Sequence, residues 1–320
     1  MERKFIKSGI PGLDDVLGGG LLEGSVVTVS GPTGAGKSTL AAQFLHNGAV
    51  DSNEPGLYIS IEESRRDFFF HLGGFEWDFQ ALERDRKFIL LDYPIHEVDQ
   101  IVTQSSAIQE IIATTGTKRV VIDSIMPIAL YFKGDDERKK GFLKFIENLR
   151  KWNTTTLIVS EDLKMGHAGS RPSSEYGIES FTDGWVNLFF KYDDKALSRA
   201  RYVEVIKMKG VDHSSRAYPA ILNSKGFSIV HEARPAETPK PQAQVHKAAP
   251  PPQKPLKTLA PRPEPEERGE PAPAEEKPKP KPAKAPPKPA AKPARPAPAK
   301  MSPTLAARLA EAKSKIMKKK

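Results

Sequence analysis

Residues 31–38 read GPTGAGKS and lie between two segments with different spacings of apolar residues. The preceding run, GSVVTVS (24–30), is short, apolar and rich in Val, which is typical of a buried strand. The following run, STLAAQFLHNGA (38–49), has the periodicity of a helix. A strand, a glycine-rich turn and a helix start are the context in which G-x-x-x-x-G-K-[ST] forms a phosphate-binding loop. The stretch therefore predicts an α/β fold that binds a nucleoside triphosphate.

The residue types in this loop account for the predicted ligand. Glycines let backbone amides converge on phosphate oxygens, and the helix start adds partial positive charge. In such a loop Lys37 reaches the β- and γ-phosphates and Ser38 holds Mg²⁺, so ATP and Mg²⁺ are the expected ligands. The alternative is a chance glycine-rich turn, which the flanking segments argue against. The expected nucleotide-binding residues are Gly31, Pro32, Thr33, Gly34, Ala35, Gly36, Lys37, Ser38 and Thr39.

Four further apolar runs alternate with helical patterns along the first 180 residues. The runs are 56–61, 87–93, 119–124 and 154–160, and the helical patterns cover about 37–49, 64–72, 97–115 and 136–152. Such alternation predicts a mostly parallel central sheet flanked by helices. After residue 183, GWVNLFFKY, ARYVEVIKMK and GFSIV predict antiparallel strands that extend one edge of this sheet.

The composition changes near residue 232, so we predict one folded domain over 1–231. Of the 29 prolines, 22 follow residue 230, and no Phe, Tyr or Trp follows Phe227. Residues 232–301 are mainly Pro, Ala, Lys and Glu, which predicts a disordered linker because apolar side chains are too few to offset the ordering entropy. For residues 302–320 we predict a short basic amphipathic helix with Ser302 as its N-cap and Pro303 at its first position. This tail could meet a protein partner, nucleic acid or an anionic surface.

The net charge of +9 belongs to the tail. Residues 231–320 carry 21 Lys and Arg against 9 Asp and Glu, which leaves 28 against 31 in the first 230 residues. The basic pI therefore does not predict that the folded part binds nucleic acid. There is no cysteine, which excludes a disulfide or a thiolate metal site. Without an apolar run of about 18 residues or a secretory leader, we expect a cytoplasmic protein that is not an integral membrane protein.

Three carboxylates stand at the ends of predicted strands. Asp123 closes RVVIDS, the place where P-loop proteins hold Mg²⁺ through an acid. Glu62 and Glu63 close the run 56–61, and neighbours on a strand point to opposite faces. One of them could align or deprotonate a water against the γ-phosphate. The alternative makes both the acidic first turn of the next helix, where the helix dipole would favour them.

The order of these segments resembles the KaiC family of RecA-like P-loop ATPases. The resemblance rests on SGIPGLDDVLGGGLLEGSVVTVSGPTGAGKST (8–39), LYISIEES (57–64), RVVIDS (119–124), TTTLIVSED (154–162) and EVIKMKGVDHS (204–214). It covers about residues 5–231 and implies Mg²⁺-dependent ATP hydrolysis, with Lys37, Glu62 and Glu63 as catalytic residues and Ser38 and Asp123 as metal ligands. We prefer Glu63 as the base only because the family pairs both acids; the alternation of strand residues does not say which of the two faces inward.

The same resemblance implies an oligomer, with a hexameric ring favoured, that holds ATP between subunits. The neighbouring subunit would supply Lys207, Lys209 and His213. Lys209 replaces the family's Arg, and a lysine cannot make the bidentate phosphate contact of a guanidinium. We therefore expect slower turnover or a different contact geometry. The alternative for this segment is a solvated turn.

Family members can also phosphorylate themselves on a Ser/Thr pair beside the nucleotide. The matching stretch, GIESFTD (177–183), keeps Ser180 but has Glu179 at the partner position. Self-phosphorylation at Ser180 is therefore a hypothesis, which mass spectrometry after incubation with ATP would test.

Two other functions are compatible with the motifs. A recombinase-like, DNA-dependent ATPase would use the loop 163–177, which offers Lys164, His167, Arg171 and Tyr176. An adaptor would bind ATP with negligible hydrolysis and recruit a partner through the tail. His46 and His71 lie in helical patterns and predict surface or core residues rather than ligands.

Overall fold

The computed structural model describes residues 3–103, 105–161 and 176–230. Three predictions lie outside the described residues: the loop cations Lys164, His167 and Arg171, the linker 232–301, and the helix 302–320. Among the described helices, none combines the length and apolar character that crossing a membrane requires.

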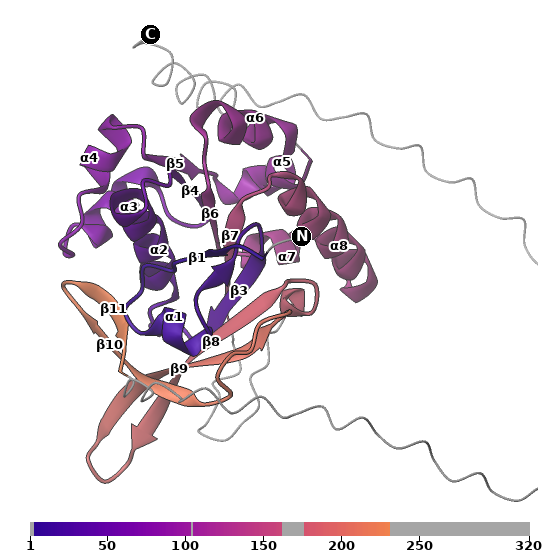
Figure 1. Ribbon diagram of the computed structural model, residues 1–320. Coiled ribbons are helices and arrows are strands. Elements are labelled where there is room, and N and C mark those ends of the chain that lie inside the picture. Colours follow the sequence, from indigo (N-terminus) through magenta and orange to yellow (C-terminus); the bar gives the residue numbers. More distant parts are fainter. Residues whose placement is uncertain (1–2, 104, 162–175, 231–320) are drawn as a thin grey trace, which may run out of the picture. The chain divides into compact units, whose positions relative to one another are not determined.

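A nine-stranded sheet forms the centre of the described domain, in the order β11-β10-β9-β8-β3-β7-β6-β4-β5 (Figure 1). The strands that run parallel are β3 (Val26–Gly31), β4 (Gly56–Ser60), β5 (Phe88–Asp92), β6 (Arg119–Asp123), β7 (Thr155–Glu161) and β8 (Gly184–Asp193). The antiparallel strands are β9 (Ser198–Met208), β10 (Ala217–Asn223) and β11 (Gly226–Ile229). The mostly parallel sheet with an antiparallel C-terminal extension is confirmed.

Two details of the sheet differ from the prediction. β8 pairs parallel with β3, so the antiparallel part begins one strand later than expected. β10 was not predicted, because Pro219 in its middle cannot donate a ladder hydrogen bond and argues against a strand. A separate two-stranded sheet joins β1 (Phe5–Ile6) to β2 (Leu21–Leu22).

Helices cover both faces of the sheet (Figure 1). The first group is α2 (Lys37–Asp51), α3 (Arg65–Leu72) and α4 (Phe79–Arg84), and the second is α5 (Val98–Thr103), α6 (Ser105–Thr115), α7 (Met126–Tyr131) and α8 (Asp135–Lys151). Short elements complete the set: α1 (Leu13–Val16) and the 3₁₀ turns η1 (Ile95–Glu97) and η2 (Ile178–Ser180). The single helix expected over 97–115 is described as η1, α5 and α6. The six-residue helices α4 and α7 are too short for periodicity to reveal.

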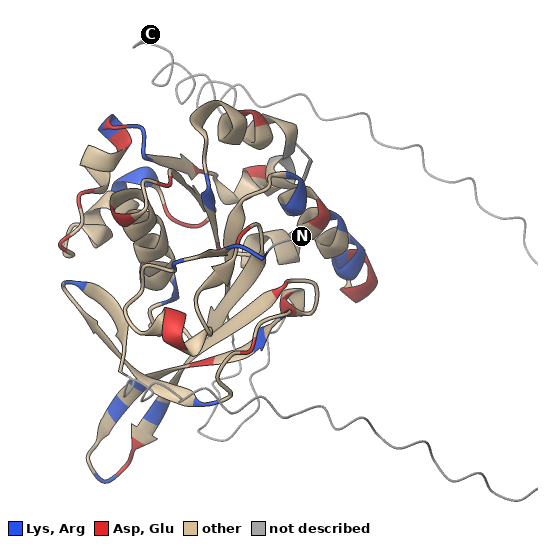
Figure 2. Cartoon of the chain, in the orientation of Figure 1, with Lys and Arg blue, Asp and Glu red and all other residues tan. Residues whose placement is uncertain are grey.

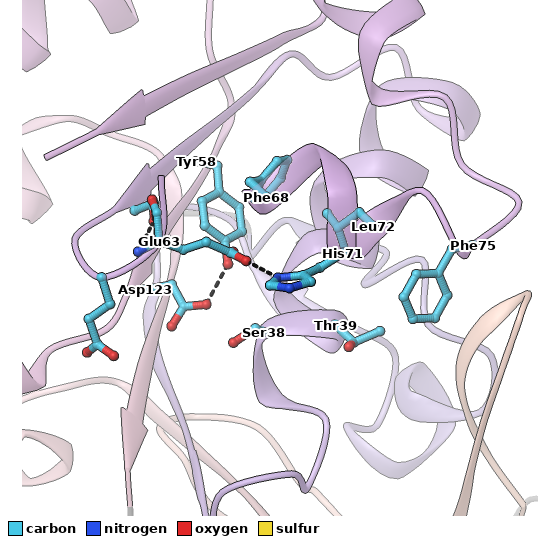
Figure 3. Close-up of a pocket in the computed structure, with 11 residues that line it drawn as sticks. Ser38, Thr39, Tyr58, Glu63, Phe68, His71, Leu72, Phe75 and Asp123 are labelled. Atoms are coloured by element: carbon cyan, nitrogen blue, oxygen red, sulfur yellow. Dashed lines mark hydrogen bonds and ion pairs between the residues drawn. The ribbon is translucent and has the colours of Figure 1, made fainter. Parts of the chain in front are cut away.

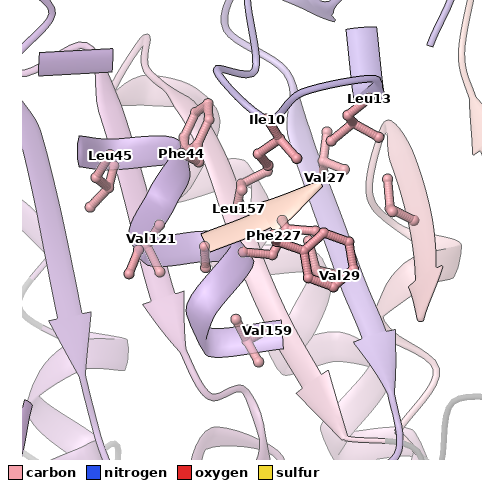
Figure 4. Packing of buried hydrophobic residues seen from close by; sticks show 14 of the residues in the cluster. Ile10, Leu13, Val27, Val29, Phe44, Leu45, Val121, Leu157, Val159 and Phe227 are labelled. Carbon is pink, nitrogen blue, oxygen red and sulfur yellow. The ribbon is translucent and has the colours of Figure 1, made fainter. Parts of the chain in front are cut away.

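The buried residues form one cluster on each face of the sheet. Neighbouring strand residues alternate between the two, so Val121 and Leu157 pack under α2 whereas Ile122 and Ile158 pack under α8. Phe227 of β11 joins the first cluster (Figure 4). Because both faces are covered, all six residues of β3 are buried, which explains the near-continuous apolar runs of the sequence.

The register of the parallel strands brings distant motifs together. Gly31 pairs with Glu161, and Ser60 pairs with Asp123, so the C-terminal ends of β3, β7, β4 and β6 lie on the same side of the domain. In α/β folds of this type, ligands bind where the strands end in this way.

Candidate active site

The loop between β3 and α2 needs glycine at both ends. Gly31 has φ 147°, and a Cβ there would come within 2.2 Å of the Leu188 carbonyl oxygen. Gly36 has φ 102°, and its Cβ would come within 3.2 Å of the Phe227 ring. Larger residues would force the loop away from β8 and β11. The spacing that predicted a phosphate-binding loop therefore also allows the loop to pack closely against the sheet.

Lys37 begins α2 and lies over this loop. It is buried, and its Nζ donates to the Pro32 carbonyl oxygen at 3.1 Å. The first amides of α2 lack partners within the helix and carry its positive end. The loop thus combines a cation with backbone donors, which suits a phosphate.

Arginine and lysine also gather on a ribbon beside the loop. β8 pairs with β3 only as far as Asn187, so the end of β8 and the beginning of β9 continue past β3, and Figure 2 shows positive residues on this ribbon. Arg201 Nη2 donates to the Gly34 carbonyl oxygen at 3.4 Å. Sequence reasoning did not select Arg201, because its proximity to Gly34 follows from the pairing of β8 with β3.

Asp123 ends β6 beside α2. The Tyr58 hydroxyl donates to Asp123 Oδ2 at 2.5 Å. Burial raises the pKa of Asp123, and the hydroxyls of Tyr58 and Ser38 and the ammonium of Lys37 offset part of the rise. Burial and the Asp123 charge raise the pKa of Tyr58 well above its ordinary value, so Tyr58 remains a proton donor. The Ser38 hydroxyl and the Asp123 carboxylate are hard oxygen ligands, which fits Mg²⁺.

Glu62 is held by the neighbouring strand end. The Ser124 hydroxyl donates to Glu62 Oε1. Burial raises the pKa of Glu62, while the Ser124 hydrogen bond acts in the opposite direction and the Asp123 charge adds to the rise. Glu62 is therefore a carboxylate whose position is fixed by the residue that follows Asp123.

Glu63 has a different environment. Its carboxylate pairs with His71 Nδ1, and its backbone carbonyl accepts from Ser60 Oγ at 2.7 Å (Figure 3). Helix α3 begins at Arg65, and its N-cap is Ser64, whose side chain accepts from the Asp67 amide. Glu62 and Glu63 precede the cap, so the alternative that placed them in the first helical turn is wrong.

A cavity of about 370 Å³ connects these residues. Figure 3 shows side chains from α2, β4, α3 and β6 around it. Its lining comprises Ser38, Thr39, Tyr58, Ser60, Glu62, Glu63, Phe68, His71, Leu72, Phe75 and Asp123. The structure thus brings the predicted metal ligands and the predicted base together. Sequence reasoning missed Tyr58, which lies within a buried run, and His71, which it placed among surface or core residues.

The residues expected to act from a neighbouring subunit lie near the N-terminal ends of the parallel strands, opposite the loop. The Lys209 amide donates to the Asp183 carbonyl oxygen at 2.8 Å, and the Asp183 amide donates to that of Val26 at 2.7 Å. Val26 begins β3 and the loop follows its other end, roughly 17 Å away at about 3.3 Å per residue. Lys209 is therefore too far from its own chain's loop to contact a phosphate there.

Lys207 and His213 have partners within the same chain. Lys207 Nζ donates to the Glu179 carbonyl oxygen at 2.7 Å, and burial together with the charge of Lys209 lowers the pKa of Lys207. His213 Nδ1 lies 3.1 Å from the Ser214 carbonyl oxygen. Ser180 is exposed and lies three residues before Asp183, which binds Val26 at the end of β3 opposite the loop.

Comparisons with known proteins agree with this architecture. Residues 6–234 match the family model described as the KaiC ATPase. A circadian clock oscillator protein KaiC of Parathermosynechococcus lividus is 32% identical over 230 residues, covering 70% of this chain and 42% of that protein. A UPF0273 protein of Thermotoga maritima is 29% identical over 240 residues, covering 71% and 96%. The crystal structure of a KaiC-like protein of Pyrococcus horikoshii has a TM-score of 0.62 and 32% identity, covering 72% and 100%.

The coverage differs between these relatives. The chain spans less than half the length of the KaiC proteins from Parathermosynechococcus lividus and Prochlorococcus marinus. It spans nearly all of the UPF0273 protein and all of the KaiC-like protein. The resemblance inferred from the motifs is thus confirmed over the described domain.

Proposed function

The chain belongs to the KaiC family of ATPases, and from that premise we propose that it binds ATP with Mg²⁺ at residues 31–39 and hydrolyses it. The observation that carries the proposal is the shared cavity of Ser38, Asp123 and Glu63. A hydroxyl at the start of α2, a buried carboxylate and a second carboxylate are the three groups that the reaction needs beside the phosphate loop.

The residues have separate roles in this mechanism. The loop amides and Lys37 bind the β- and γ-phosphates, and Ser38 and Asp123 would hold Mg²⁺, which neutralises phosphate charge when bound. Glu63 orients a water and accepts its proton. The water oxygen bonds to the γ-phosphorus, the bond from that phosphorus to the bridging oxygen breaks, and its electron pair leaves on ADP.

Glu63 suits the base better than Glu62 does. Each carboxylate has one oxygen in a contact: Glu62 Oε1 accepts from the Ser124 hydroxyl, and Glu63 Oε1 pairs with His71 Nδ1. The partners differ: Ser124 directly follows the proposed metal ligand Asp123, so Glu62 is placed to orient the metal site, whereas the partner of Glu63 comes from α3. We therefore assign Glu62 to positioning and Glu63 to proton transfer.

We further propose an oligomer in which each nucleotide contacts the next subunit, in the manner of a ring. Lys207 and Lys209 lie near the N-terminal ends of the parallel strands, opposite the loop, and cannot reach the nucleotide of their own chain. They can instead contact a nucleotide that is bound to a second chain. A cation supplied in this way stabilises charge on the transferring phosphoryl group.

Multiple-turnover ATP hydrolysis by the full chain tests the proposed function. The wild type should turn over with Mg²⁺, and Glu63→Gln should lower kcat by about 10²–10⁴-fold, the usual contribution of a general base, with little change in nucleotide Kd. Glu76→Gln is the matched control, because Glu76 contacts Ser224 outside the cavity.

Other outcomes of this assay point to the other functions. Equal, near-zero rates in the wild type and Glu63→Gln would indicate an ATP-binding adaptor instead. Strong stimulation of the wild type by single-stranded DNA would favour a recombinase-like ATPase.

A further inference from the structure

We propose that His71 is a positioning residue for hydrolysis, which holds the Glu63 carboxylate in the orientation that accepts the proton of the attacking water. The inference rests on the proposed function, since it assigns a partner to the base of that same site. It adds a residue that the sequence motifs leave out.

The contact joins two different elements. Glu63 precedes α3, and its backbone is tied to β4 on both sides: its amide donates to Ser60 Oγ at 3.2 Å and its carbonyl accepts from that hydroxyl. His71 lies in the last turn of α3 and presents Nδ1 to Glu63 Oε1 (Figure 3). The backbone of Glu63 is fixed by Ser60, and the imidazole then fixes the end of its side chain.

Structural roles are already filled by other residues. Ser64 caps α3 by accepting from the Asp67 amide, so the helix does not need Glu63 for its N-terminus. The two side chains keep exposed fractions of 64% for His71 and 33% for Glu63. A side-chain contact with this much exposure contributes little to stability, so its position in the cavity with Ser38 and Thr39 is the more informative feature.

The chemistry follows from the two oxygens of a carboxylate. When Nδ1 carries the proton, His71 donates to Glu63 Oε1 and leaves Oε2 to accept from water. The O–H bond of the water breaks, its proton moves to Glu63, and its oxygen attacks the γ-phosphorus, while ADP leaves with the electron pair. His71 transfers no atom. It restricts the rotation of a side chain that would otherwise sample several orientations, and misplacement of a reacting group slows catalysis steeply.

Two substitutions separate orientation from mere presence of a side chain. His71→Ala removes the donor and should lower kcat on the order of 10-fold, with nucleotide Kd unchanged. His71→Asn places an amide nitrogen the same number of bonds from Cα as Nδ1, so it should keep kcat within about 3-fold of the wild type.

The matched control is His96→Ala. His96 also faces a glutamate, Glu97, at 4.0 Å and is 81% exposed, but it lies on η1 outside the cavity. This variant should retain the wild-type kcat. Circular dichroism and the melting temperature of each variant show whether α3 remains folded.

A double-mutant cycle decides between positioning and a general disturbance. If His71 acts through Glu63, His71→Ala should have no further effect on the residual rate of Glu63→Gln. The inference would be overturned if His71→Ala lowered kcat by the same factor in the Glu63→Gln background as in the wild type. It would also be overturned if His71→Ala had the kcat of the wild type, or if His71→Asn had a kcat as low as that of His71→Ala. Turnover that needs Glu63 but not His71 overturns this inference alone, whereas a wild type without turnover overturns the proposed function as well.

Discussion

The Asp183 side chain joins β3, α8 and the turn after β9, at the end of the parallel strands opposite the active site. Its carboxylate accepts from the Val26 amide at 3.1 Å, from Arg150 Nη2 at 2.9 Å and from Lys209 Nζ at 3.3 Å. Burial alone would raise the pKa of Asp183, but the Val26 amide and the two cations outweigh it and lower the pKa. The charged carboxylate is therefore the form that stabilises the fold.

This arrangement predicts a pH-dependent effect of Asp183→Asn. A lowered pKa means that the stabilisation is present above the unfolded-state pKa of about 4 and is lost as pH falls through the lower folded-state value. Asp183→Asn should cost about 1–3 kcal/mol of unfolding free energy at pH 7. The difference from the wild type should shrink below about pH 4.

Urea unfolding at several pH values measures this difference. Asp135→Asn is the control, because its ion pair with Arg138 is 76% exposed on the aspartate side and should contribute less than about 1 kcal/mol. A cost of Asp183→Asn that is equal at pH 7 and pH 3.5 would show that the charge of the carboxylate does not matter.

Strands could be predicted from this sequence more completely than helices. The central parallel strands β3, β4, β6 and β7 are buried on both faces, so their residues form apolar runs that can be recognised without knowing which strands are neighbours. The helix α8 was also predicted, because its buried residues Phe142, Phe145, Ile146 and Leu149 repeat at helical spacing. β10 alternates between partly buried and exposed residues around Pro219, and neither feature distinguishes it from a loop.

The candidate site divides in a similar way. The loop 31–38, the paired acids and Asp123 could be predicted because each follows a recognisable strand in the chain. Tyr58, Ser124 and His71 could not, because their contacts depend on which strands are neighbours and on where α3 lies. Only the parallel register of β4 with β6 places the Tyr58 hydroxyl at Asp123, and only the position of α3 brings His71 to Glu63.

At the scale of the whole molecule, the two ends of the parallel strands carry complementary halves of one proposed site. The loop, Asp123 and the paired acids lie at the C-terminal ends of these strands, and Lys207 and Lys209 lie near their N-terminal ends. A closed ring joins such heterologous surfaces head to tail, so that every copy contacts one neighbour through each of the two surfaces. Activity should then depend on contacts between chains.

Mixing two inactive variants tests this dependence. Lys37→Ala removes the phosphate contact in one chain and Lys209→Ala removes the cation that the neighbour supplies, so each alone should hydrolyse ATP slowly. In a mixture with random assembly, roughly a quarter of the interfaces combine an intact loop with an intact Lys209, and turnover should recover accordingly. Light scattering with ATP and Mg²⁺ should show an oligomer, with a hexamer favoured. A monomer under these conditions, or a mixture no faster than its components, would contradict the arrangement.

All of these proposals depend on the binding of a nucleotide at residues 31–39. Isothermal titration calorimetry of the full chain with ATP and Mg²⁺ measures this binding directly. The account predicts saturable binding by the wild type and its loss in Lys37→Ala, while Lys4→Ala, which removes an exposed partner of Glu23, binds as the wild type does. Absence of heat with folded wild-type protein, or the same Kd for Lys37→Ala, would contradict the account.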